Sequence, residues 1–275
     1  MDIKLLAFDL DGTALMSHRE LSEKNRAALE AAGKYGVILV PSTGRIRGFL
    51  PKSISDISAV NYAITSNGAA VVNIRNGECL HGAYIRNETA VKVQKILNAY
   101  DVYVEYYFNG EAYTLKGNPE KAMKDAEFPK SKHHFLSKKY IYVDDLNDFV
   151  SSPGITPEKI NMPYLPEGVR ARLIEEIGRL EGLHLTSSIP DNLEVNGAAG
   201  TKGQALEWLC GHLGVSREEC MAIGDNGNDA DMLRYAGVSV AMGNSSAEAF
   251  EAAKYTTASC EQDGFADAVE RFILI

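Results

Sequence analysis

The chain has 275 residues, enough for two hydrophobic cores of moderate size, and its 45% hydrophobic and 24% charged residues are ordinary for a globular protein. Its 37 acidic residues outnumber its 28 basic residues, which gives a net charge of −9. This balance argues against nucleic acid or an anionic membrane as the partner. An anionic small molecule can still bind where a metal ion or a lysine reverses the local charge.

The first predicted element is a buried strand over residues 3–8, in which only Lys4 interrupts the apolar run. The strand runs into Asp9, Leu10 and Asp11. In an extended chain the two carboxylates share one side and Leu10 points to the other. Carboxylates are costly to bury unpaired, so this strand end requires a cation, a partner or water. We hypothesise that the pair binds a divalent metal while one acid attacks and the other moves a proton; an Asp-Gly turn without chemistry is the alternative.

Helices and strands then alternate. Ser22 is a predicted cap for a helix that stops near Gly33 or Gly36. Buried strands are predicted over residues 37–40 and 62–65, and each of them also ends in small polar residues. This order is typical of a Rossmann-like, doubly wound parallel α/β sheet, in which ligands bind outside the carboxyl ends of the strands.

A different pattern begins near residue 83. Tyrosines become frequent, and residues 102–106 alternate polar with apolar side chains, which predicts an antiparallel sheet with one solvated face. Amphipathic helical patterns precede and follow this stretch. We therefore expect a core of residues 1–82 and 191–275 around an inserted α+β domain of residues 83–190.

The alternating pattern returns in the last third of the chain. A helix is predicted from Lys202, and a buried strand over residues 221–223 ends just before Asp225, Asn228 and Asp229. A sheet interrupted by an insertion must close around it. The acidic residues of the first and last thirds are therefore expected to meet at one cleft.

The location expected from the sequence is cytoplasmic. Cys79, Cys210, Cys220 and Cys260 include no C-x-x-C pair, so reduced thiols are expected in place of a zinc site or a disulfide framework. The first residues lack the features of a signal peptide. No apolar run approaches the roughly 18 residues that span a bilayer, so no membrane partner is expected.

Four polar clusters stand at predicted strand or helix ends. They are DLDGT at 9–13, STGR at 42–45, TKG at 201–203 and GDNGND at 224–229. Together and in this order they resemble the haloacid dehalogenase (HAD) superfamily, in particular its Cof-like, type IIB sugar-phosphate phosphatases. Asn67-Gly68 also resembles a recurring loop of that group. The resemblance covers both halves of the core, and it implies that the insertion is a cap of type C2B.

The resemblance implies a reaction through an aspartyl-phosphate. Asp9 would attack phosphorus, and Asp11 would protonate the departing alcohol and then activate water. The implied Mg²⁺ ligands are Asp9, the backbone carbonyl of Asp11, and Asp225. The implied phosphate ligands are the amides of Leu10 and Gly44, the Thr43 hydroxyl, the Lys202 ammonium and Asn228, with Asp229 supporting Lys202 or a metal-bound water.

The expected function is therefore a Mg²⁺-dependent phosphatase that acts on a small phosphorylated metabolite, by family analogy a sugar phosphate. The inserted domain would select the leaving group, and the chain would be a monomer or a weak homo-oligomer. A phosphomutase on hexose phosphates, a non-catalytic phospho-switch and a silent sugar-phosphate sensor are the alternatives. Asp11 argues against the switch, and also against a dehalogenase, since relatives with that activity lack the second aspartate.

Overall fold

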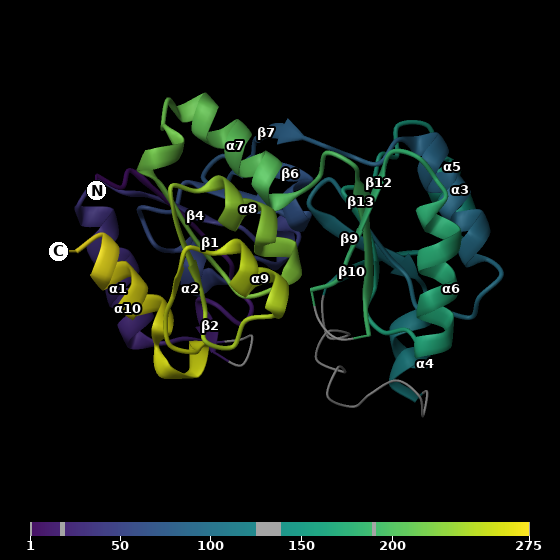
Figure 1. The fold of residues 1–275 in the computed structure, drawn as a ribbon. Helices are drawn as coiled ribbons and strands as arrows, with labels where there is room; N and C mark the ends of the chain where they lie inside the picture. Colours follow the sequence, from purple (N-terminus) through teal and green to yellow (C-terminus); the bar gives the residue numbers. More distant parts are fainter. Residues whose placement is uncertain (1, 17–19, 125–138, 189–190, 275) are drawn as a thin grey trace. The chain divides into compact units, whose positions relative to one another are not determined.

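The computed structural model describes residues 2–16, 20–124, 139–188 and 191–274 (Figure 1). The chain forms two compact units, Met1–Gly82 with Thr201–Ile275, and Ala83–Gly200. Residues 191–200, which the sequence pattern placed in the core, thus belong to the second unit. The reason is that β13 (Leu193–Gly197) pairs on both sides with strands of the second unit.

The first unit is built on a five-stranded sheet in the order β16-β15-β14-β1-β4, and every pair of neighbours is parallel. In the register, Phe8 of β1 lies opposite Ile223 of β14 on one side and Pro41 of β4 on the other. The carboxyl ends of β14, β1 and β4 therefore lie at one edge. The strands are β1 (Leu5–Phe8), β4 (Ile38–Pro41), β14 (Cys220–Gly224), β15 (Val238–Ala241) and β16 (Tyr255–Thr256).

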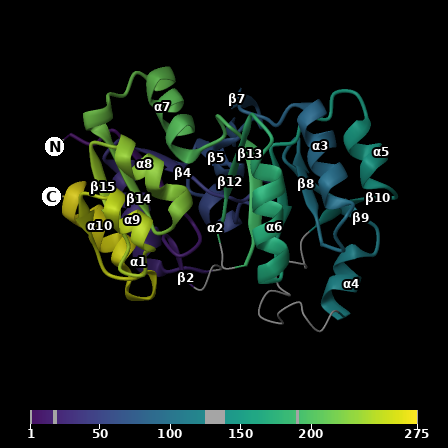
Figure 2. The ribbon, with the colours of Figure 1, turned by 45° about the vertical axis from the view of Figure 1, so that its right-hand side comes forward.

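Helices cover both faces of this sheet, which confirms the predicted doubly wound core (Figures 1 and 2). Side chains of β1 alternate between the faces: Leu6 and Phe8 pack with α1 and α10, whereas Leu5 and Ala7 pack with α7, α8 and α9. The Phe8 ring lies 5.3 Å from that of Phe265. The helices are α1 (Glu23–Lys34), α7 (Lys202–Leu213), α8 (Ala230–Tyr235), α9 (Ala247–Ala252) and α10 (Gly264–Phe272).

One strand expected in the parallel sheet belongs to a separate three-stranded sheet, although it lies parallel to the chain at the end of β4. β5 (Tyr62–Thr65) pairs antiparallel with β6 (Ala70–Asn73), which pairs with β7 (Cys79–Gly82). Only isolated parallel bridges, such as that of Ser42 to Ile64, connect β5 to the chain at β4. The remaining elements of this unit are β2 (Leu15–Met16), β3 (Glu20–Leu21), α2 (Lys52–Ser55) and the short 3₁₀ helices Arg47–Phe49, Ser66–Gly68, Arg217–Glu219, Gly227–Asp229 and Cys260–Gln262.

The second unit contains a six-stranded mixed sheet in the order β10-β9-β8-β11-β13-β12, in which only β10 and β9 pair in parallel. Tyr106, Ile160 and Val195 pack one face against α3, α5 and α6, which lie together on one side of the sheet (Figure 1). This confirms the α+β insertion. Its elements are α3 (Asn87–Leu97), β8 (Glu105–Phe108), β9 (Glu111–Leu115), α4 (Asn118–Lys124), β10 (Tyr140–Val143), α5 (Leu146–Ser151), β11 (Lys159–Met162), α6 (Glu167–Gly178) and β12 (Leu183–Thr186).

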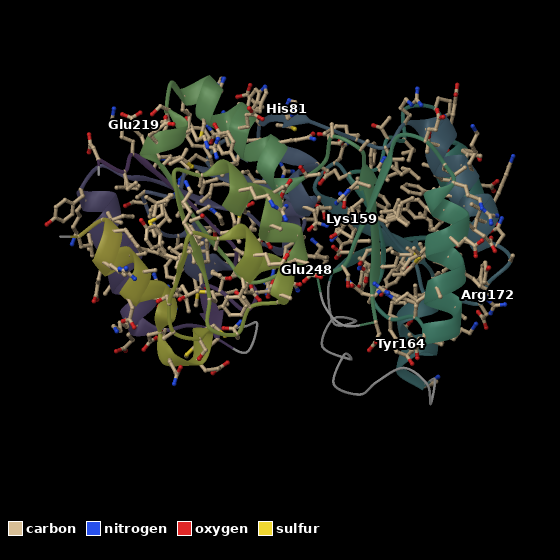
Figure 3. All side chains as sticks on the ribbon, in the orientation of Figure 1. His81, Lys159, Tyr164, Arg172, Glu219 and Glu248 are labelled. Atoms are coloured by element: carbon tan, nitrogen blue, oxygen red, sulfur yellow. The ribbon has the colours of Figure 1, made fainter. Side chains whose placement is uncertain are left out.

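The other face of this sheet is polar, and residues of β8, β11 and β13 on it are buried where we expected a solvated face, whereas Tyr142 on β10 is 49% exposed. Lys159, labelled in Figure 3, forms an ion pair of 2.9 Å with Glu194, and both side chains are less than 5% exposed. Glu105 accepts hydrogen bonds from the Tyr140 hydroxyl at 2.5 Å and the Asn161 amide at 2.8 Å. Charges can be buried in this way because each carboxylate has donors.

None of the helices in the described part of the chain combines the length and the apolar character that crossing a bilayer requires.

Candidate active site

The candidate site lies at the edge of the first unit where β1, β4 and β14 end. Asp9 follows β1, Thr43 lies two residues beyond β4, and Asp225 follows β14. Hydrogen bonds keep these ends in register, because the Asp9 amide donates to the Ile223 carbonyl at 2.9 Å and the Ser42 amide donates to Phe8 at 2.7 Å. Residues far apart in the sequence are thus brought to one place by parallel pairing.

Three aspartates form a cluster at this edge. Carboxylate oxygens of Asp9, Asp225 and Asp229 all lie within 4.8 Å of one another. Lys202, the first residue of α7, is completely buried, and its Nζ lies 2.6 Å from Asp9 and 2.5 Å from Asp229. One ammonium therefore faces three carboxylates, which leaves an excess of negative charge.

Neighbouring groups hold the other cluster oxygens in place. Asp229 Oδ2 accepts hydrogen bonds from the backbone amides of Asp225 at 2.9 Å and Asn226 at 3.0 Å. The Thr13 hydroxyl donates to Asp225 at 2.7 Å. Gly12, with φ of 89°, lies so close that a Cβ there would come within 2.5 Å of Asp225 Oδ2. The glycine of DLDGT is therefore required both by its backbone conformation and by this close approach.

The charge excess changes the protonation of the cluster. Burial, followed by the neighbouring carboxylates, raises the pKa of Asp9 to about 7, although Lys202 opposes this. Burial, Asp9 and Asp229 raise the pKa of Asp225 to about 8. Burial alone would lower the pKa of Lys202, but Asp229 and Asp9 raise it above its usual value, so the side chain stays charged.

The cluster fits a divalent cation. Three oxygen-bearing side chains converge, and an added cation would balance the excess negative charge that raises the two aspartate pKa values. The third carboxylate of the cluster is Asp229. Asp11, whose expected contribution to the metal is its backbone carbonyl, does not place its carboxylate in this group.

Asp11 departs from the expected arrangement. The chain turns at Leu10, whose carbonyl accepts a hydrogen bond from the Leu15 amide at 2.8 Å, so residues 9–11 do not continue as a strand. The Asp11 carboxylate accepts two hydrogen bonds from Arg45, from Nε at 2.8 Å and from Nη2 at 2.6 Å. No role is expected for Arg45 from the sequence, although it is the last residue of STGR and carries the charge that complements Asp11.

Of the residues expected to bind phosphate, Lys202 begins α7 and Asn228 lies in a 3₁₀ helix, whereas Leu10, Thr43 and Gly44 lie in the segments that follow β1 and β4. Thr43 is fully buried, and its hydroxyl accepts a hydrogen bond from the Arg45 amide at 3.1 Å; Gly44 between them is partly buried. The Asn228 amide donates to Asn67 Oδ1 at 3.2 Å, and the Asn67 backbone amide donates to the Thr43 carbonyl at 3.0 Å. Asn67 therefore connects two of the expected ligands.

The loop that carries Asn67 has an uncommon backbone. Ser66, Asn67 and Gly68 have φ values of 52°, 62° and 102°. A Cβ on Gly68 would come within 2.1 Å of the Thr201 carbonyl oxygen, immediately before Lys202. Backbone strain of this kind is retained where the surrounding structure requires one conformation. In the sequence, the resemblance of Asn67-Gly68 to a family loop was the one signal that this loop matters for the site.

Known proteins resemble the chain along its whole length. The profile of the haloacid dehalogenase-like hydrolases matches residues 6–269. The chain is 29% identical to the 5-amino-6-(5-phospho-D-ribitylamino)uracil phosphatase YcsE of Bacillus subtilis, over 100% of this chain and 97% of the relative. It is 30% identical to the HMP-PP phosphatase of Cronobacter sakazakii, over 88% and 84%. Among solved structures, the HAD subclass IIB sugar phosphatase BT4131 shares its fold with a TM-score of 0.83 at 24% identity, over 99% of this chain and 100% of that one.

Proposed function

Because the chain belongs to the haloacid dehalogenase-like hydrolases and is a phosphatase of that family, we propose that it hydrolyses sugar phosphates through an aspartyl-phosphate on Asp9. The observation that carries this proposal is the buried contact of Asp9 with Lys202 beside two further aspartates. Phosphate esters react very slowly without catalysis, so the site must position a nucleophile and supply positive charge.

The chain's own residues divide the work as follows. Asp9 attacks phosphorus with the carboxylate that Lys202 orients, and the Lys202 ammonium also offsets charge on the phosphoryl oxygens. Asp11 gives a proton to the leaving oxygen and then takes one from water. The Leu10 and Gly44 amides, the Thr43 hydroxyl and the Asn228 amide orient the phosphoryl group.

Mg²⁺ is the ion that we propose for the aspartate cluster. Asp9, Asp225 and the Asp11 backbone carbonyl would hold it, and Asp229 supports the site through Lys202 and the amides of the loop. When bound, Mg²⁺ supplies positive charge that stabilises the phosphoryl oxygens. The proposal includes a cytoplasmic location and a monomer or weak homo-oligomer, without nucleic acid or membrane as partner.

The test is phosphate release from a panel of phosphorylated metabolites that includes hexose phosphates, pentose phosphates and ribityl phosphates. We expect release that EDTA stops and Mg²⁺ restores. Asp9→Asn removes the attacking anion and should abolish turnover, whereas Asp11→Asn should slow it by about 10²–10⁴-fold. Full activity of Asp9→Asn would reject the mechanism.

The same incubation separates the alternatives. A phosphomutase would convert a hexose 1-phosphate into its 6-phosphate isomer without equivalent free phosphate. A phospho-switch would give a stable phosphoprotein without turnover, and a silent sensor would give neither product. Phosphorus NMR of the reaction mixture distinguishes all four outcomes.

A further inference from the structure

Arg45 and Asp11 form a bidentate contact, which we call the fork. Nε and Nη2 of one guanidinium donate separately to the two oxygens of Asp11, at 2.8 and 2.6 Å. Two parallel hydrogen bonds fix the plane of a carboxylate as well as its distance, which a single contact cannot do. The two side chains are 26% and 27% exposed, so solvent reaches the pair only in part.

Arg45 is itself held along its length. Its amide donates to the Thr43 hydroxyl at 3.1 Å, and its carbonyl accepts from the Ser66 amide at 2.9 Å. At the far end, Nη1 lies 3.5 Å from the Phe49 carbonyl, to which it donates. The loop after β4 thus fixes the position of the guanidinium, and the guanidinium in turn fixes the orientation of the Asp11 carboxylate. Because the arginine fork is planar and rigid, little conformational freedom is left to the pair.

We propose that Arg45 is a positioning residue that aims the Asp11 carboxylate at the leaving-group oxygen. This inference rests on the proposed function, in which Asp11 transfers the proton. An unrestrained aspartate rotates about two single bonds, and a misplacement of about 1 Å can cost about 10²-fold in rate. Asp9 is held by Lys202 and Asp225 by Thr13, so removal of the fork leaves those contacts in place.

The test compares two phosphate esters in the Arg45→Gln variant. An alkyl phosphate such as glycerol phosphate needs a proton on its leaving oxygen, whereas 4-nitrophenyl phosphate releases a stable anion. The measured quantity is kcat/KM, which reports the steps through departure of the leaving group. We expect a loss of about 10–10²-fold for the alkyl ester, a much smaller loss for the nitrophenyl ester, and little change in KM.

Arg47→Gln is the matched control, because Arg47 lies on the same loop and donates to the Gly77 carbonyl at 2.5 Å, away from Asp11. It should leave the ratio of the two kcat/KM values unchanged. If thermal unfolding shows that Arg45→Gln does not fold, Arg45→Lys takes its place. A lysine keeps the charge but makes a single-point contact, so the same selective loss is expected.

A double-mutant cycle decides whether Arg45 acts through Asp11. If it does, adding Arg45→Gln to Asp11→Asn should change kcat/KM for the alkyl ester by no more than about twofold. Independent losses would overturn the inference, as would equal losses on both esters with a raised KM, which would indicate that Arg45 binds the substrate. If the unaltered protein released phosphate from no ester, the proposed function would fail instead.

Discussion

Replacement of Lys202 by methionine is the most direct test of the buried charge cluster. Methionine keeps much of the length of the side chain but removes the ammonium. Lys202 is completely buried, and its Nζ lies 2.6 Å from Asp9 and 2.5 Å from Asp229, so the change leaves two buried carboxylates without their shared counter-charge. Removing one partner of a buried ion pair costs about 3–5 kcal/mol of folding free energy. Because Asp9 and Asp229 both lose their partner, we expect a loss at the upper end of this range, about 5 kcal/mol.

The cost should depend on pH. The pKa of Asp9 is already about 7 with Lys202 present, and loss of the ammonium moves it further up. At pH 6 Asp9 in the variant can bind a proton, which removes much of the uncompensated charge. The destabilisation is therefore expected to be larger at pH 8 than at pH 6.

Urea unfolding followed by circular dichroism, without divalent cations, measures the free energy of unfolding at both pH values. Lys24→Met is the matched control. Lys24 also forms a 2.6 Å ion pair, with Asp267, but the two side chains are 45% and 46% exposed, so its loss should change stability little. Equal effects of Lys202→Met and Lys24→Met, or an effect of Lys202→Met that does not vary with pH, would refute the reasoning.

Two further predictions concern stability. The pKa values of Asp9 and Asp225 are raised from 3.8 to about 7 and about 8. Between these values the folded metal-free protein keeps protons that the unfolded chain has lost. The stability that these protons contribute is therefore lost as the pH rises toward 8. Mg²⁺ should therefore raise the melting temperature more at pH 8 than at pH 6, and an equal shift at both pH values would contradict this. In thermal unfolding, Gly68→Ala should lower stability more than Gly36→Ala, because both glycines have a positive φ but only a Cβ on Gly68 would clash with Thr201. The Gly36 variant carries only the cost of the left-handed conformation, about 1–2 kcal/mol. Similar losses in the two variants would contradict this prediction.

The sequence predicted the parts of the fold that depend on local pattern. The buried runs of β1, β4 and β14 were recognisable because each apolar run ends abruptly at polar or charged residues. Parallel pairing then brings Asp9 and Asp225 to one edge, as expected from the alternating order of helices and strands.

What the sequence could not predict depends on pairing between distant segments. β5 reads as one more buried strand of the parallel sheet, but only isolated parallel bridges join it to the chain at β4, and its continuous pairing is antiparallel, with the neighbouring β6. The end of the second unit was placed too early because the apolar alternation of β13 fits either sheet, and only its pairing with β11 and β12 decides the matter. The turn at Leu10 likewise breaks the two-residue periodicity that put Asp9 and Asp11 on one side.

The position of β1 between β4 and β14 has a consequence for protein synthesis. A chain emerging from the ribosome can pair β1 with β4 early, but β14 begins at Cys220, after the whole second unit has been translated. Lys202, which balances Asp9, also follows that unit in the chain. The nascent N-terminal segment thus carries Asp9 for most of translation without a counter-charge, and the aspartate cluster is assembled only when synthesis is almost complete.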